Sequence, residues 1–308
     1  MPSSFKNQTI KTNKNKENKM KKVLLVLLSI ALAFTAIAPS QAQDQKVLAI
    51  IDTAINSKAF PQVIHEVCFN THTATCPNGQ KTMEGPGAAN LSVWPHPSVS
   101  GAWHGDWMVK GALKADPTIK IVFIRYVEIT GSGTYRNDGL SLVNAIDWVA
   151  KNAEKYSIDA LSISQSNINT PSWCAGNKTT VDAVALLNTK NVPVFAATGN
   201  NARADIVGFP SCVSGVIGVG ALLPNKTGFE KNTNGQSKIN PGLDIATFGA
   251  VEIHMGNNLN AKFNLAGSSG ATVASAATYL KNNSYKTFQE YFNALPKIVI
   301  NTVSYSSN

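Results

Sequence analysis

Charged residues are scarce in this sequence, and most of the positive excess lies at one end. Lys, Arg, Asp and Glu make up 15% of the 308 residues, with 27 basic and 18 acidic side chains. Residues 1–42 hold seven lysines and one glutamate, which leaves 20 basic and 17 acidic residues, a net charge of +3, in residues 43–308. The composition of this larger part therefore gives no reason to expect a nucleic-acid partner.

Long apolar runs are missing too, apart from one near the N-terminus. The run from Val23 to Ala38 follows Lys21-Lys22, and the small residues of Ser40-Gln41-Ala42 suit a signal peptidase. This run is shorter than the ~20 residues of a membrane-spanning helix, and no later segment approaches that length. We expect residues 1–42 to be a signal peptide with a polar N-terminal extension, and the protein to be secreted or periplasmic with no membrane span.

The sequence also lacks repeats, low-complexity tracts and linkers that would divide residues 43–308. This length fits a single domain with a substantial core. No loop is rich enough in acids to be recognised as a calcium site, so we expect no cofactor and no metal. The oligomeric state stays open.

Cysteine is rare, and its number is even. The four cysteines are Cys68, Cys76, Cys174 and Cys212. In an exported protein an even number predicts two disulfides, and proximity in the sequence favours Cys68–Cys76, which leaves Cys174–Cys212. An alternative is a tetrahedral zinc site. Its ligands would be His65, Cys68, His72 and Cys76.

What the chain does contain is a series of short apolar runs rich in Val and Ile. They lie at residues 47–51, 119–124, 160–163, 192–197 and 216–219. Continuous rather than alternating apolar residues predict strands buried on both faces, as in a parallel sheet. Helical patterns at 140–156 and 181–190 lie between them. The sequence therefore predicts an α/β fold, a mostly parallel central sheet with helices on both faces.

Three stretches carry the chemistry. Asp52 ends an apolar run, His104 is followed by a glycine, and Ser269 lies among small residues. An acid, a base and a nucleophile in the order Asp, His, Ser match one of the known orders of a serine-protease triad. Asp52 and Asn200 both come just after predicted strands, where reactive residues of α/β folds gather.

The order of motifs resembles that of the subtilisin-like serine peptidases, the subtilases. The resemblance extends from about Val47 to about Leu280. Collinear motifs are more specific than any single one. The segments that carry it are Ile50–Ile55, Gly131–Tyr135, Asp159–Ser164, Val194–Asn200, Phe209–Ser211, Val216–Ala221, Leu243–Gly249 and Gly267–Ala271.

The resemblance implies a role for each of four side chains. Asp52 would orient His104, His104 would take the proton of Ser269, and Asn200 would donate its amide to the oxyanion. Simpler interpretations are a turn acid at Asp52 and a helix cap at Ser268 beside an inert Ser269. Asn201 is an alternative oxyanion donor.

The resemblance also implies that the substrate binds as an extended strand between two backbone edges. These edges are Ser132, Gly133, Ser164, Gln165 and Ser166. Ser166-Asn167 replaces a pair that is usually Gly-Gly, which should narrow the first specificity pocket or make it more polar.

Several positions depart from the family pattern. Large residues, Trp107 among them, follow His104 where small ones are usual, so the helix should sit differently or Trp107 should fill part of the pocket. Gly270 stands where methionine is usual, and Val273 where proline is usual. The folding propeptide of most secreted subtilases is not evident before Val47. We therefore expect no maturation beyond removal of the signal peptide.

Taken together, the sequence predicts a secreted serine endopeptidase that acts on proteins or peptides. Two alternatives remain. One is a peptide-binding protein of this fold with weak or no activity, and the other is a processing peptidase of narrow specificity.

Overall fold

The chain separates into two compact units, Met1–Gln45 and Lys46–Asn308. The computed structural model describes residues 45–71, 76–90, 104–129, 135–136, 138–167, 171–203, 205–222, 245–248, 251–255, 258–265, 267–282 and 284–295. The predicted signal peptide lies outside these residues, as do His72, Ser132 and Gly133. All that follows concerns the second unit.

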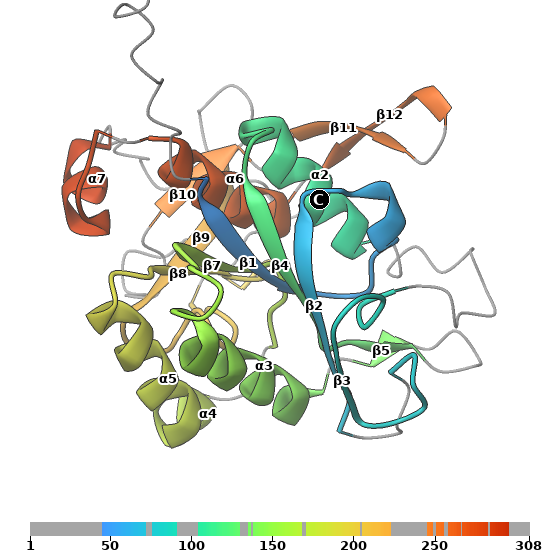
Figure 1. Cartoon of the computed structure of the whole chain (residues 1–308). Helices are drawn as coiled ribbons and strands as arrows, with labels where there is room; N and C mark the ends of the chain where they lie inside the picture. Colours follow the sequence, from blue (N-terminus) through green and yellow to red (C-terminus); the bar gives the residue numbers. More distant parts are fainter. Residues whose placement is uncertain are drawn as a thin grey trace, which may run out of the picture. The chain divides into compact units, whose positions relative to one another are not determined.

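A central sheet organises this unit (Figure 1). Its described strands run in the order β10-β9-β8-β7-β1-β4-β2-β3, and every neighbouring pair is parallel except β2 and β3. The bounds are β1 Val47–Asp52, β2 Val63–Phe69, β3 Thr82–Glu84, β4 Lys120–Arg125, β7 Ala160–Ile163, β8 Val194–Ala197, β9 Val216–Leu222 and β10 Ile245–Phe248.

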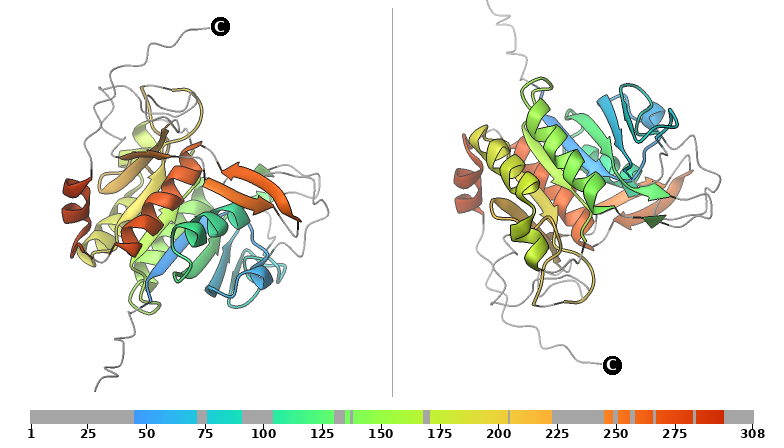
Figure 2. Two further views of the ribbon diagram at one scale, coloured as in Figure 1. Left: turned by 90° about the horizontal axis from the view of Figure 1, so that it is seen from above. Right: turned by 90° about the horizontal axis from the view of Figure 1, so that it is seen from below.

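Helices cover both faces of the sheet, as Figure 2 shows from opposite sides. Helices α3 and α5 lie on one face, and α2 and α6 on the other. The helices are α2 His104–Ala115, α3 Gly139–Asn152, α4 Pro171–Gly176, α5 Lys178–Thr189, α6 Gly267–Lys281 and α7 Phe288–Ala294, with a 3-10 turn at Ser57–Ala59. Two small antiparallel pairs are β5 Glu128–Ile129 with β6 Tyr135–Arg136, and β11 Val251–Met255 with β12 Asn258–Leu265.

The alternation of side chains along the strands creates two separate cores. In β1, Ile51 faces α3 and α5, while Ile50 faces α2 and α6. All six residues of β1 are buried. The first five are apolar because neither face of a central parallel strand meets water, and Asp52 ends the strand. The predicted α/β fold with a mostly parallel sheet and helices on both faces is confirmed.

The two disulfides pair as expected. Cys68 at the end of β2 is joined to Cys76, and Cys174 in α4 is joined to Cys212 before β9. A disulfide leaves no thiolate for a metal, so the alternative zinc site at His65, Cys68, His72 and Cys76 loses its two sulfur ligands.

Candidate active site

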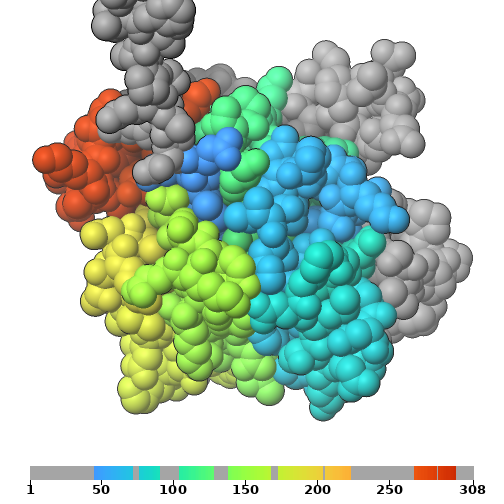
Figure 3. Space-filling view, in the orientation of Figure 1, coloured from blue at the N-terminus to red at the C-terminus, as the bar shows by residue number. Residues whose placement is uncertain are grey.

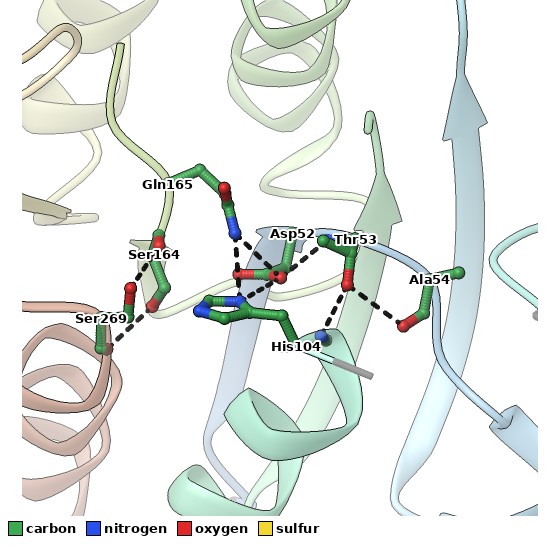
Figure 4. Close-up of polar contacts among 8 residues, drawn as sticks. Asp52, Thr53, Ala54, His104, Ser164, Gln165 and Ser269 are labelled. Carbon is green, nitrogen blue, oxygen red and sulfur yellow. Dashed lines mark hydrogen bonds and ion pairs between the residues drawn. The ribbon is translucent and has the colours of Figure 1, made fainter. Parts of the chain in front are cut away.

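Two of the predicted triad residues lie in direct contact (Figure 4). Asp52 ends β1, His104 begins α2, and His104 Nδ1 lies 2.7 Å from Asp52 Oδ1. The Asp52 side chain is fully buried, whereas 19% of the His104 side chain is exposed. A fully buried acid thus holds one ring nitrogen of a partly exposed histidine.

Close packing requires a glycine, Gly105, directly after this histidine. A Cβ atom at this position would lie 2.5 Å from the carbonyl oxygen of Ala54 and 2.9 Å from the Phe123 ring, closer than van der Waals contact permits. The Gly105 N–H donates to Thr53 Oγ1 at 2.7 Å, and the Thr53 N–H donates to Asp52 Oδ1 at 2.7 Å. The start of α2 is therefore fastened to the end of β1.

The large residue that departs from the family pattern packs beside the histidine. The ring of Trp107 lies 6.1 Å from that of His104, tilted by 56°, and the side chain also packs against the core under α2. The helix still delivers His104 to Asp52, so Trp107 does not displace the imidazole from the acid.

The third residue, Ser269, lies in the first turn of α6 and is 9% exposed. Its hydroxyl donates to the Ser164 carbonyl at 2.8 Å, and the Ser164 hydroxyl donates to the Ser269 carbonyl at 3.1 Å. Figure 4 shows the outer nitrogen of His104 on the side of Ser164 and Ser269. Among the bonds of these described residues, none joins Ser269 to His104, so a proton can pass between them only after the hydroxyl turns away from Ser164.

The Asn200 amide has a fixed orientation. Ser268 donates to Asn200 Oδ1 twice, from its backbone N–H at 2.9 Å and from its hydroxyl at 3.0 Å. These bonds hold the oxygen of the exposed Asn200 side chain on Ser268, and its NH₂ group lies beside Gly267 at the start of α6. Gly267, with φ +78°, permits this approach, because a Cβ there would lie 3.0 Å from the Asn200 amide.

The Ser268 hydroxyl is thus occupied at Asn200, with the Gly199 N–H donating to it at 3.3 Å. The possibility of a simple helix cap at Ser268 is replaced by a bridge from α6 to the segment after β8. This bridge lies between the two side chains expected to act as nucleophile and oxyanion donor.

Of the two predicted substrate edges, only the second lies within the described residues. Asn167 and Phe209 exchange backbone hydrogen bonds of 2.9 and 2.7 Å, so the backbone of Asn167 is already paired. Gly208 packs against Ser166, since a Cβ on Gly208 would lie only 1.8 Å from the Ser166 hydroxyl. These Asn167 groups are therefore not available to pair with a peptide, and Ser166 occupies the space next to Gly208.

Sequence reasoning missed the side chain of Gln165. It was expected to contribute backbone only, yet its Nε2 lies 3.3 Å from Asp52 Oδ1 and 3.0 Å from His104 Nδ1. The residue is 9% exposed, and Figure 4 shows its amide directed at the Asp52–His104 pair. Its position after β7 was a signal that it lies near the site, but nothing in the sequence indicates which way the side chain turns.

Buried charged residues also lie on α2 and on β4, the strand next to β1. Asp106 on α2 accepts from the Asn56 N–H at 2.8 Å, and burial raises the pKa of Asp106 although that N–H and Lys110 act against it. Arg125 lies beside Asp52 in the β1–β4 register and is almost fully buried. Its guanidinium donates to the carbonyls of Val127 and Asn90.

Within the described ranges, no group of three or more His, Cys, Asp or Glu side chains is arranged to hold a metal. The search for a helix able to cross a bilayer, over that same part of the chain, finds none with the needed length and hydropathy.

Comparison with known proteins places these observations in a family context. No family model matches the chain. Subtilisin DY from Bacillus licheniformis is 29% identical over 119 residues, which are 38% of this chain and 38% of that protein. The matched part thus spans well under half of the length of this curated relative.

Solved structures match over a larger share. A protease from Pseudoalteromonas arctica has a TM-score of 0.61 at 15% identity and covers 80% of this chain and 81% of its own. A lanthipeptide protease has a TM-score of 0.55 at 13% identity, covering 80% and 78%. The protease domain of PatA, solved as a mutant, has a TM-score of 0.54 at 18% identity, covering 76% and 78%.

These matches confirm the fold and the resemblance noted in the sequence. The chain has the fold of the subtilisin-like proteases and is similar in sequence to a subtilisin. The roles of individual residues stay predictions.

Proposed function

We propose that the protein is a serine endopeptidase of the subtilisin type. The observation that carries this is the 2.7 Å contact between fully buried Asp52 and accessible His104, at the end of the sheet where α6 presents Ser269. A buried acid behind a histidine, beside a serine at a helix N-terminus, is an arrangement suited to nucleophilic catalysis.

In the proposed reaction Ser269 attacks the carbonyl carbon of the scissile peptide bond. His104 Nε2 takes the hydroxyl proton, and Asp52 stabilises the imidazolium through its bond to Nδ1. The same proton then goes to the leaving amine. Water repeats the sequence on the acyl-enzyme and frees Ser269.

The oxyanion that forms twice in this reaction needs donors. We assign this role to the Asn200 amide and the Ser269 backbone N–H. The two bonds from Ser268 to Asn200 Oδ1 support the assignment, because they leave the NH₂ end available. A donor held in place before the reaction costs no reorganisation during it.

For substrate, we propose a protein or peptide bound as an extended strand along Ser164–Ser166, with Ser132–Gly133 as the opposite edge. Ser166 against Gly208 supports a first pocket that is narrow and polar. Some fold neighbours are described as maturation proteases, of patellamide and of prenylagaramide. A narrow processing role is therefore a specific form of this proposal.

We further propose that the protein acts outside the cytoplasm. The leader in residues 1–42 and the two disulfides support this, because disulfides persist in oxidising compartments.

One observation favours a second candidate, a peptide-binding protein that does not cut. The Ser269 hydroxyl is bonded to the Ser164 carbonyl and not to His104. If that bond persists when a peptide binds, the serine is not activated.

A fluorophosphonate probe separates the two candidates. For an active peptidase we expect covalent labelling of the wild-type protein, loss of labelling in Ser269→Ala, and strong loss in His104→Ala. A folded wild-type protein that binds peptides and resists the probe would instead support the binding function.

A further inference from the structure

The side chain of Gln165 forms a triangle with the two groups behind the proposed nucleophile. Its Nε2 lies 3.3 Å from Asp52 Oδ1 and 3.0 Å from His104 Nδ1, and those two atoms lie 2.7 Å apart. Two of the three contacts meet at Asp52 Oδ1, and the third joins Gln165 Nε2 to His104 Nδ1 (Figure 4).

The donor and acceptor groups of the three side chains determine which atoms carry the protons. The Gln165 NH₂ group can only donate, and ionised Asp52 can only accept. If His104 Nδ1 accepted from Gln165, its lone pair would face a buried carboxylate oxygen at 2.7 Å, which is repulsive. Nδ1 must therefore carry a proton, and both Nδ1 and Gln165 donate to Asp52 Oδ1.

Asp52 Oδ1 then receives three donors, because the Thr53 N–H also points at it. Asp52 Oδ2 is buried and has no hydrogen-bond partner among the described residues. The oxygen that accepts from His104, Asp52 Oδ1, thus also accepts from Thr53 and Gln165. The positive end of the Gln165 amide also lies beside the ring nitrogen.

We propose that Gln165 is a positioning residue of the active site. By donating to Asp52 Oδ1 next to His104 Nδ1, it holds the pair in place and keeps His104 uncharged, hence able to act as a base, in more acidic medium than the pair alone would allow. This inference rests on the proposed peptidase function, because it concerns the same histidine.

Two physical effects determine in which direction the Gln165 amide shifts the protonation of His104. A carboxylate that already accepts from a neutral amide gains less from an imidazolium proton. In addition, the amide dipole opposes a positive charge placed 3.0 Å away. Removing the amide relieves both effects, so protonation of His104 becomes easier and the acid limb of activity moves to higher pH.

Other charges near the pair do not account for such a change. Besides His104, the described ionisable groups on the neighbouring elements α2 and β4 are Asp106, Lys110, Lys114, Lys120 and Arg125. None of them is altered by a substitution at Gln165. The segment directly after β7 and the first turn of α6 carry only neutral side chains, among them Ser164, Gln165, Ser268 and Ser269.

The test replaces Gln165 with methionine, which has a similar length but donates no hydrogen bond. We expect the midpoint of the acid limb, in the pH dependence of kcat/KM or of fluorophosphonate labelling, to rise by about 0.5–1 pH unit. The midpoint and not the plateau rate is the readout, because Gln165 also lies in the proposed substrate edge. Gln165→Leu removes the same donor with another shape and should give the same rise, so a folding defect in one variant does not end the test.

Gln289→Met is the matched control. Gln289 lies exposed on α7, where its amide donates to Asn293, so the same exchange there should leave the midpoint unchanged. A merely structural role for Gln165 would lower the plateau without moving the midpoint, and that result would overturn the inference.

Failure of the proposed peptidase function and failure of the inference about Gln165 give different results. If the wild-type protein is not labelled, the peptidase proposal fails, and titration of the His104 ring proton by NMR still decides the inference. The signal is assigned from its loss in His104→Gln. A midpoint in Gln165→Met higher than in wild type supports the role of Gln165, whereas equal midpoints contradict it.

Discussion

At the scale of single residues, the site depends on atoms that are held before any substrate arrives. Asp52 is held by Thr53 and Gln165, Asn200 by Ser268, and neither can turn without losing a bond. Ser269 is the exception, because its hydroxyl must leave the Ser164 carbonyl before it can react. Substitutions of Asp52 or Asn200 should therefore change the orientation of the catalytic groups more than the affinity for the substrate.

Replacing Asp52 with asparagine tests the orienting acid. The amide keeps the shape of the carboxylate but can turn its NH₂ group to Nδ1, which stabilises the wrong histidine tautomer. We expect kcat on a peptide substrate to fall by about 10⁴-fold with little change in KM. Asp182→Asn, at an exposed site on α5, should retain full activity. A fall below tenfold at Asp52 would show that His104 does not depend on it.

Replacing Asn200 with alanine tests the oxyanion donor. We expect kcat to decrease by about 10²–10³-fold while KM changes little, because the amide acts only when charge develops on the substrate oxygen. Asn188→Ala, which removes an amide bonded to the Gly215 carbonyl near the end of α5, serves as the control. Equal losses in kcat and in substrate affinity would instead indicate a role in binding.

At the scale of elements, the fold requires close packing where α2 begins. Gly105→Ala places a methyl group 2.5 Å from the Ala54 carbonyl, a backbone atom that cannot move away cheaply. We expect the free energy of unfolding, measured by urea denaturation, to decrease by about 1–3 kcal/mol or more. Gly176→Ala at the end of α4 meets no atom within 4 Å and should be close to neutral. Comparable values for both variants would remove the packing explanation.

A second contact between elements should respond to acid. Glu84 on β3 bonds to His65 on β2 and to Tyr156 after α3. Figure 3 shows the cyan part of the chain, which contains β3, adjoining the green part, which contains α3. Burial alone would raise the pKa of Glu84, but hydrogen bonds from Tyr156, His65 and Trp148 outweigh it and lower the pKa below the ordinary 4.5. The contact therefore stabilises the fold above pH 4.5 and is lost as the pH falls below that value.

We expect the urea midpoint of the wild-type protein to fall more steeply below pH 4.5 than that of Glu84→Gln. An amide cannot titrate, so the variant lacks this part of the pH dependence. Because almost half of the Glu84 side chain is exposed, the difference should be small. Parallel curves for the two proteins from neutral pH into the acid range would show that Glu84 does not contribute.

The elements were also the part of the structure that the sequence predicted best. Buried strands give continuous apolar runs, and the predicted runs coincide with β1, β4, β7, β8 and β9. The helix expected at 140–156 ends earlier, at Asn152, because the chain turns through Ser157, with φ +51°, to enter β7. The antiparallel edge strand β3 was not predicted, since three residues carry no periodic signal.

The sequence predicted where the main site residues lie, but not in which direction all of their side chains point. Strand ends and a His-Gly pair mark where side chains emerge, which placed Asp52 and His104 at the same edge. No comparable sequence signal predicts side-chain rotamers. The turn of Gln165 toward Asp52 and the bond from Ser269 to Ser164 depend on packing between segments about 100 residues apart.

At the scale of the whole molecule, the disulfides should contribute unequally. Cys174–Cys212 spans 38 residues and Cys68–Cys76 spans 8, so the longer loop restricts the unfolded chain more. We expect the Cys174→Ser/Cys212→Ser variant to lose about 1 kcal/mol more stability than the Cys68→Ser/Cys76→Ser variant. Calorimetry of both variants decides this, and a larger loss for the short loop would point to native-state packing as the main contribution.

The order of strands in the sheet also has a consequence for assembly. The middle strand β1 comes first in the described chain, yet its partners come much later: Val47 pairs with Lys120 and Leu48 with Ala160. During synthesis β1 therefore lacks its β4 partner until Lys120 has been made, 73 residues after Val47, and its β7 partner until Ala160 has been made, 112 residues after Leu48. Long waits of this kind slow folding.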